Sequence, residues 1–157
     1  GVPFDLNKIF DNYENINLSF LGRLNIDTWN NSKSLEEYLN NLTKQELILK
    51  ELELELQFYT TLLYKPIFKS RVMNLYETLA RFKYDIGHLD ENRVKLLSKI
   101  STLLNQITSK IESKETTFDH ILIDHMNDLE TEILKFHERI SNLKLGLFEY
   151  IQSTVLD

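Results

Sequence analysis

The feature that most constrains this chain is an unbroken heptad pattern of apolar residues near its C-terminus. Steps of four and three residues keep side chains on one face of an α-helix, because the helix turns once every 3.6 residues. We therefore predict a long helix over residues 118–153, capped by Thr116 or Thr117. Nine residues make its seam: Leu122, Met126, Leu129, Ile133, Phe136, Ile140, Leu143, Leu147 and Tyr150.

A second heptad pattern predicts another long helix over residues 34–64. Ser34 and Glu37 have the spacing of a capping box, in which each side chain satisfies a backbone N–H of the other residue. Pro66 cannot donate a backbone hydrogen bond and disfavours helical geometry at Lys65, so the helix should end near residue 64 or kink there, and an end is favoured. Its seam is Leu35, Tyr38, Leu42, Gln45, Leu49, Leu52, Leu56, Tyr59 and Leu63.

Two helices are expected between these long ones. The first, over residues 67–86, should end at Gly87, because glycine readily takes the positive φ found after a helix C-terminus. The second, over residues 91–114, should be capped by Asp90. The expected apolar faces are Phe68, Val72, Leu75, Leu79, Phe82 and Ile86 in the first, and Leu97, Ile100, Leu104, Ile107 and Ile111 in the second.

These elements predict an all-α fold. Only four Gly and two Pro occur in the chain, too few for the tight turns of an all-β domain. Short connections at residues 87–90 and 113–117 predict antiparallel neighbours. We expect an elongated antiparallel up-down helical bundle of three to four long helices with coiled-coil-like packing, and a short N-terminal helical cap.

The N-terminal residues 1–30 are interpreted as a docking segment, and residues 31–157 as the bundle. The segment mixes asparagines with apolar residues, including Phe4, Phe10 and Trp29, and should contain a short helix near residues 5–14. It docks either on the bundle itself or on a partner protein. The chain begins at Gly1 and not at Met, so we expect it to be a fragment of a longer protein.

The stretch "KELELELQF", residues 50–58, alternates charged or polar with apolar residues as a half-buried strand would. Glu and Leu are strong helix formers and Glu is depleted in strands, so a helix is favoured. On that helix a second apolar stripe, interrupted by Glu51 and Glu55, lies beside the seam. A helix with two apolar stripes needs neighbours on two sides. The stripe is Leu47, Leu54, Phe58 and Leu62.

Catalytic and metal-binding patterns are weak. His120, Asp124 and Asp128 share one helical side and form the only candidate metal ligands, but a charged helix face exposed to solvent explains them better. The zinc motif HExxH, the Glu-x-x-His pairs of di-iron bundles, phosphate-binding glycine loops and nucleophile elbows are absent from the sequence. We predict a non-enzymatic protein without a cofactor.

Charge argues against nucleic acid as a partner. The formal net charge is −6, so no overall field attracts polyanions. Lys65, Lys69, Arg71, Arg81 and Lys83 form a modest basic group, which leaves a membrane-surface or nucleic-acid binder open as an alternative. The chain has no cysteine, no apolar run long enough to span a membrane and no signal peptide, so we expect an intracellular location, cytoplasmic or nuclear.

The predicted function is a protein–protein interaction module in a larger intracellular assembly, of a tethering, SNARE-regulatory, cytoskeletal or kinetochore type. Its partner would be another helical protein or the rest of a complex. The alternative is a coiled coil whose task is to associate with a second copy of itself. The predicted partner-binding residues are Leu47, Glu51, Leu54, Glu55, Phe58 and Leu62 with Phe4, Phe10 and Trp29.

Overall fold

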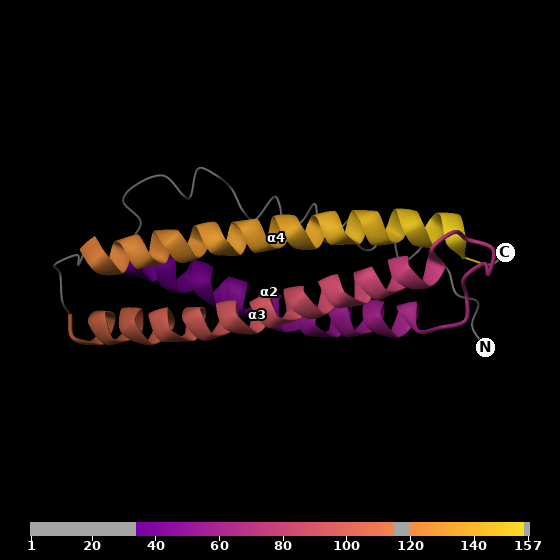
Figure 1. The fold of residues 1–157 in the computed structure, drawn as a ribbon. Coiled ribbons are helices and arrows are strands. Elements are labelled where there is room, and N and C mark those ends of the chain that lie inside the picture. The colour runs from indigo at the N-terminus through magenta and orange to yellow at the C-terminus, as the bar shows by residue number, and fades with distance from the viewer. Residues whose placement is uncertain (1–33, 115–119, 156–157) are drawn as a thin grey trace.

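The computed structural model describes residues 34–114 and 120–155, and within them it confirms the all-α prediction. Three helices, α2 (Leu35–Leu63), α3 (Leu75–Glu112) and α4 (His120–Thr154), account for 87% of the described residues. The described part contains no strand, and its only β-type pairing is an isolated antiparallel bridge between Phe68 and Val155. Figure 1 shows the three helices along one axis.

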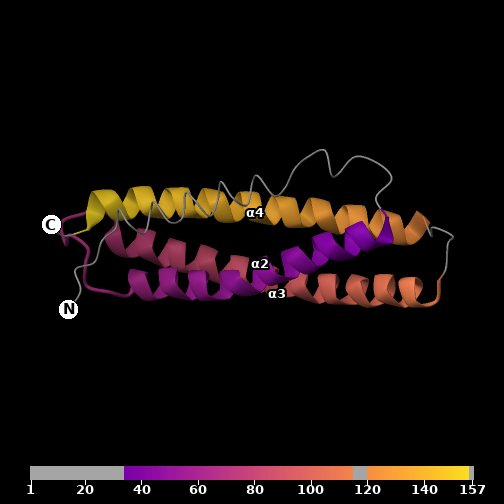
Figure 2. The same cartoon turned by 180° about the vertical axis from the view of Figure 1, so that it is seen from behind.

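The helices alternate in direction from one to the next along the chain. α2 runs antiparallel to α3, and α3 runs antiparallel to α4, so α2 and α4 are parallel (Figures 1 and 2). At 1.5 Å per residue α3 is about 57 Å long, and α2 and α4 are about 44 and 52 Å. The described part is therefore a rod, with the connection from α2 to α3 at one end and the C-terminus of α3 beside the N-terminus of α4 at the other.

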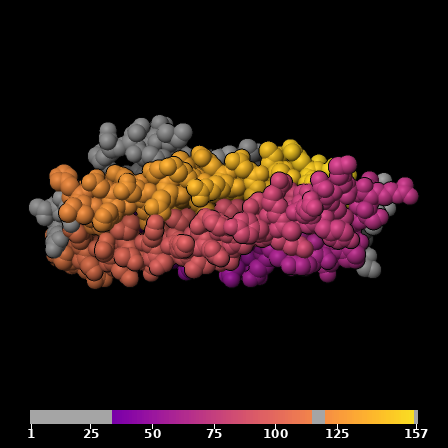
Figure 3. Space-filling view, viewed as in Figure 1, coloured from indigo at the N-terminus to yellow at the C-terminus, as the bar shows by residue number. Residues whose placement is uncertain are grey.

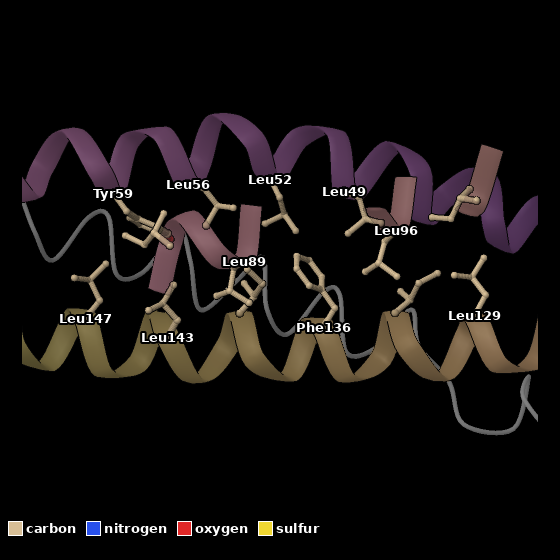
Figure 4. Packing of buried hydrophobic residues seen from close by; sticks show 14 of the residues in the cluster. Leu49, Leu52, Leu56, Tyr59, Leu89, Leu96, Leu129, Phe136, Leu143 and Leu147 are labelled. Atoms are coloured by element: carbon tan, nitrogen blue, oxygen red, sulfur yellow. The ribbon is translucent and has the colours of Figure 1, made fainter. Parts of the chain in front are cut away.

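A single apolar core runs the length of this rod. Figure 4 shows Leu49, Leu52 and Leu56 of α2 facing Phe136 and Leu143 of α4 across it. The predicted α4 seam is correct: all nine residues contact the core, and all but Tyr150 are buried. In the predicted α2 seam only Leu35 and Gln45 are partly exposed.

Both predicted ends of α2 are found. The Ser34 hydroxyl accepts a hydrogen bond from the Glu37 backbone N–H at 3.2 Å, which is one of the two hydrogen bonds of the predicted capping box. The helix ends at Leu63, three residues before Pro66. A connection over residues 64–74 then leads to α3, and the Lys69 N–H donates to the Thr154 carbonyl at 2.7 Å. The predicted caps Thr116 and Thr117 lie outside the described residues.

The prediction of two helices between residues 67 and 114 is wrong. One helix, α3, runs without a break through Gly87 and Asp90, and residues 67–74 precede it. The physical reason is a heptad that continues across Gly87, with Arg93 at a position otherwise held by apolar residues. Burial along this seam outweighs the cost of about 1 kcal/mol for a glycine inside a helix. The buried residues are Leu75, Leu79, Phe82, Ile86, Leu89, Arg93, Leu96, Ile100, Leu103 and Ile107.

The predicted core face of residues 91–114 is also partly wrong. Ile100 and Ile107 are fully buried as expected, but Leu96 and Leu103 share the core with them. Leu97, Leu104 and Ile111 are only partly buried and pack against the edge of the core. The predicted set and the observed set of core residues both have heptad spacing. Which set is buried depends on where α2 and α4 lie, and the periodicity of one helix does not give those positions.

Candidate protein-interaction surface

The candidate surface is a strip on the outer side of α2, which we call the α2 stripe and define as Leu47, Glu51, Leu54 and Phe58. All four residues are exposed. Leu54 keeps 74% of its surface in water and Phe58 38%. The face of α2 that points toward α4 is occupied instead by Leu49, Leu52, Leu56 and Tyr59 (Figure 4). The α2 stripe is therefore an apolar strip that the described helices leave uncovered.

Two residues predicted to share this surface lie elsewhere. Leu62 is buried in the core, at 6% exposure. The Glu55 carboxylate is 2.5 Å from the Lys144 ammonium of α4, and both side chains are largely buried. It also accepts a hydrogen bond from the Tyr59 hydroxyl at 2.6 Å. Glu55 thus serves the contact between α2 and α4.

Polar side chains join α2 to α4 at two further levels of the rod. The Tyr38 hydroxyl donates to Asn127 Oδ1 at 3.1 Å. Two turns further along α2, Gln45 Oε1 lies 3.0 Å from His137 Nε2. Together with Glu55 and Lys144 these form three polar rungs, spaced along an interface that is otherwise apolar.

The join between α2 and α3 depends on a buried arginine. Arg93 is almost fully buried, and its Nε donates to Asp90 Oδ1 at 2.8 Å. Its Nη1 donates to the Leu49 carbonyl of α2 at 3.4 Å, and Glu53 of α2 lies 4.0 Å from its Nη2. Asp90, expected to cap a helix, instead neutralises this buried cation. The sequence signal was available, because Arg93 stands at a heptad position of α3.

His137 is held neutral by its surroundings. Burial of the imidazole, together with the smaller effect of the nearby positive charge of Lys144, lowers the pKa of His137 to about 3. Because Gln45 Oε1 only accepts, Nε2 of His137 carries the hydrogen. The buried imidazole is therefore a structural group, and its protonation would place two cations together inside the rod.

This lowered pKa predicts that acid destabilises the fold. Well above pH 6.5 His137 carries almost no proton in either the folded or the unfolded chain, so its titration does not change the stability. Below pH 6.5 His137 binds a proton in the unfolded chain, but in the folded chain it does so only near pH 3. Acid therefore favours the unfolded chain. We expect His137 to account for a loss of about 2 kcal/mol between pH 7.5 and pH 5.

Urea unfolding at several pH values measures this effect, with His137→Gln as the comparison. The variant should lose less stability than the original chain over that range, because glutamine does not titrate. The imidazole NMR signal of His137 can be identified because it is missing from the spectrum of His137→Gln. In the original chain this signal should keep the chemical shift of a neutral histidine down to pH 4.5. Parallel stability curves for the two proteins would contradict the assignment.

His120, Asp124 and Asp128, the candidate metal ligands that were weighed from the sequence and not favoured, form no metal site with other described residues. Within residues 34–114 and 120–155 no three His, Asp or Glu side chains are grouped so that they could hold a metal ion. His125, a neighbour of these residues, lines an open groove of about 640 Å³ between α3 and α4. Its other lining residues are mainly uncharged and polar, including Asn105, Gln106 and Ser109. These side chains suggest no catalytic arrangement.

The basic residues gather near the end of the rod that carries the connection between α2 and α3. Lys65, Arg71 and Arg81 are exposed there, and Lys69 and Lys83 are partly exposed. Beside them lie four exposed apolar residues that were not predicted as functional: Tyr64, Met73, Tyr76 and Tyr84. In a heptad search such residues are ignored, because they fall in a connection or off the seam.

Phe4, Phe10 and Trp29 lie outside the described residues.

Comparison of the chain with protein-family models, with curated proteins and with solved structures finds no match. In the described part, none of the helices combines the length and the apolar character that crossing a membrane requires.

Proposed function

We propose that this chain is a non-enzymatic protein–protein interaction module within a larger intracellular assembly, and that the α2 stripe binds a helix of another protein. The proposal rests mainly on the exposure of Leu54 and Phe58 on a helix whose opposite face already fills the core. Isolated exposed apolar residues are common on proteins, whereas a row of them on one helix face favours a partner.

The spacing of the α2 stripe suits a helical partner. Leu47, Leu54 and Phe58 are separated by seven and four residues, so they follow one side of α2 over about 16 Å. Helices that pack side by side make contacts at such intervals. The exposed carboxylate of Glu51 would lie at the edge of this contact, where polar residues commonly surround apolar anchors.

We further infer that residues 1–30 complete the molecule as a short helical cap on the long helices. In this proposal Phe4, Phe10 and Trp29 supply apolar anchors, either to the bundle or to the same partner. A cytoplasmic or nuclear location remains part of the proposal, and its support is the absence of cysteine from the sequence.

A photo-crosslinking phenylalanine analogue at position 58 tests the function and identifies the partner. We expect it to link covalently to one protein in cells, whereas the same analogue at Val94, an exposed position on α3, should not. The affinity of the purified partner should then fall at least tenfold for the double variant Leu54→Ser, Phe58→Ser, because anchors near the centre of an interface dominate binding.

The double variant Val94→Ser, Leu145→Ser is the matched control, because both side chains are exposed on other helices. It should bind the partner as the original chain does. Circular dichroism should show equal helicity in both variants. Equal affinity of the two variants would contradict a role for the α2 stripe, and cross-linking only to a second copy of this chain would favour the self-associating alternative.

A further inference from the structure

The end of the rod formed by residues 64–84 combines exposed apolar residues with positive charge, and we call it the connection end. Met73 keeps 85% of its surface exposed and Tyr76 84%, and Tyr64 is exposed as well. These residues lie in or next to the turn between α2 and α3. In Figure 3 the magenta atoms of this region project outward at one end of the molecule.

The charge of the connection end is opposite to that of the rest of the chain. Residues 64–84 hold five of the eighteen basic residues and one of the twenty-four acidic residues. Lys65, Arg71 and Arg81 take part in none of the ion pairs between described residues. The remaining chain has a clear excess of acidic residues, so positive charge is concentrated at one end.

Aromatic and basic groups of the connection end are held together. The Lys83 ammonium lies 3.7 Å from the centre of the Tyr64 ring, within the range of a cation–π contact. This contact joins the first residue of the connection to the third turn of α3. The cation and the ring therefore present one combined surface, with Tyr64 still largely exposed.

The shape of the connection end decides which anionic partner fits. Three of the grooves in the described part lie along α3 and α4, and these three include no residue from 64–84. An acidic membrane surface uses both parts of the connection end, because its headgroup region takes up projecting apolar side chains and its phosphates attract the nearby cations. Nucleic acid would use the cations but would leave Met73 in water.

We propose that the connection end docks on an acidic membrane surface. Met73, Tyr76 and Tyr64 enter the headgroup region, where aromatic and apolar side chains with polar neighbours are favoured. Lys65, Arg71 and Lys83 contact lipid phosphates and carboxylates. Each such basic residue strengthens binding to an acidic leaflet about fivefold.

The part of the rod outside residues 64–84, which we call the shaft, has an excess of acidic residues and determines the orientation of the docked rod. At physiological salt, charges more than about 8 Å from the surface are largely screened. A rod lying flat would bring its acidic side chains within that distance along its whole length of about 57 Å. A rod standing on its connection end keeps them away, so the proposed docking is end-on and leaves the α2 stripe free.

Vesicle co-sedimentation of the whole chain tests this proposal. We expect binding to phosphatidylcholine vesicles that contain 30% phosphatidylserine, at least tenfold weaker binding to pure phosphatidylcholine, and loss of binding as salt rises from 50 to 300 mM. The variants Met73→Ser, Tyr76→Ser and Lys65→Glu, Arg71→Glu should each weaken binding to the acidic vesicles at least tenfold. All four positions are exposed, so the helicity of both variants should stay unchanged.

Matched controls use exposed positions on the shaft. Val94→Ser, Leu145→Ser controls for lost apolar surface, and Lys95→Glu, Lys135→Glu controls for reversed charge. Both should bind acidic vesicles as the original chain does. No binding at 50 mM salt, or an equal effect of shaft and connection-end variants, would overturn the proposal. The proposal would also be overturned if the chain bound a 20-base-pair DNA duplex more tightly than acidic vesicles and only Lys65→Glu, Arg71→Glu weakened that binding. This result would assign the cations to nucleic acid.

Discussion

Replacing Phe136 by alanine is expected to lower the free energy of unfolding by about 3–5 kcal/mol. Phe136 is 2% exposed and lies midway along α4, where the core is closed on both sides by α2 and α3. Its ring also contacts the imidazole of His137, with 5.7 Å between ring centres. Removing the ring leaves a cavity that three long helices cannot close without shifting several seam residues at once.

Urea unfolding followed by circular dichroism measures the loss. Leu145→Ala is the control, because Leu145 lies on the same helix with its side chain exposed. That variant should change stability by about 0.5 kcal/mol or less. A loss below about 1 kcal/mol for Phe136→Ala would mean that the core does not close around the ring.

Replacing Lys144 by methionine should cost about 3–5 kcal/mol, although methionine matches the shape of lysine and is more apolar. The change leaves the Glu55 carboxylate with only 13% of its side chain exposed and without its cation 2.5 Å away. A buried carboxylate that loses its cation keeps its desolvation penalty and loses its electrostatic compensation.

A double-mutant cycle with Glu55→Gln measures the interaction between the two charges. Glutamine keeps an oxygen that can accept a hydrogen bond from the Tyr59 hydroxyl. The double variant Glu55→Gln, Lys144→Met buries a neutral pair, so it should be more stable than the sum of the two single losses by about 1–3 kcal/mol. Strict additivity would show that the two charges do not interact.

The surface pair of Lys50 and Glu46 is the matched control for this cycle. Its atoms are 3.4 Å apart, but the lysine side chain is 62% exposed. Lys50→Met should cost about 0.5 kcal/mol or less, because water and salt weaken an exposed pair. The contrast between Lys144 and Lys50 therefore separates the effect of burial from the effect of charge.

Periodicity predicted most of α2 and α4, because long runs of apolar residues at heptad spacing have few other interpretations. It failed at Gly87 and Asp90, where local preferences for a helix end were weighed above a seam that continues through Leu89, Arg93 and Leu96. A search restricted to apolar residues does not count an arginine at a core position. Local propensity was overridden by packing against two other helices.

The candidate surface was predictable only in part, and for a similar reason. Leu47, Leu54 and Phe58 lie off the core face, as the angular spacing on α2 implied. Glu55 faces inward because Lys144 lies opposite, and 89 residues separate the two in the sequence. No pattern within one helix contains that information. The connection end was missed because Met73 and Tyr76 matter through their shared location in space.

The three polar rungs between α2 and α4 select one alignment of two helices that could otherwise slide. A seam made of leucines accepts a shift of one heptad with little change in apolar contact. Such a shift of α2 would put Leu62 or Ile48 opposite Lys144 in place of Glu55, burying an ammonium against an aliphatic side chain. His137 would face Leu52 or Tyr38 in place of Gln45. The polar residues thus give a repetitive interface a single register, and that register fixes the position of the α2 stripe along the length of α4.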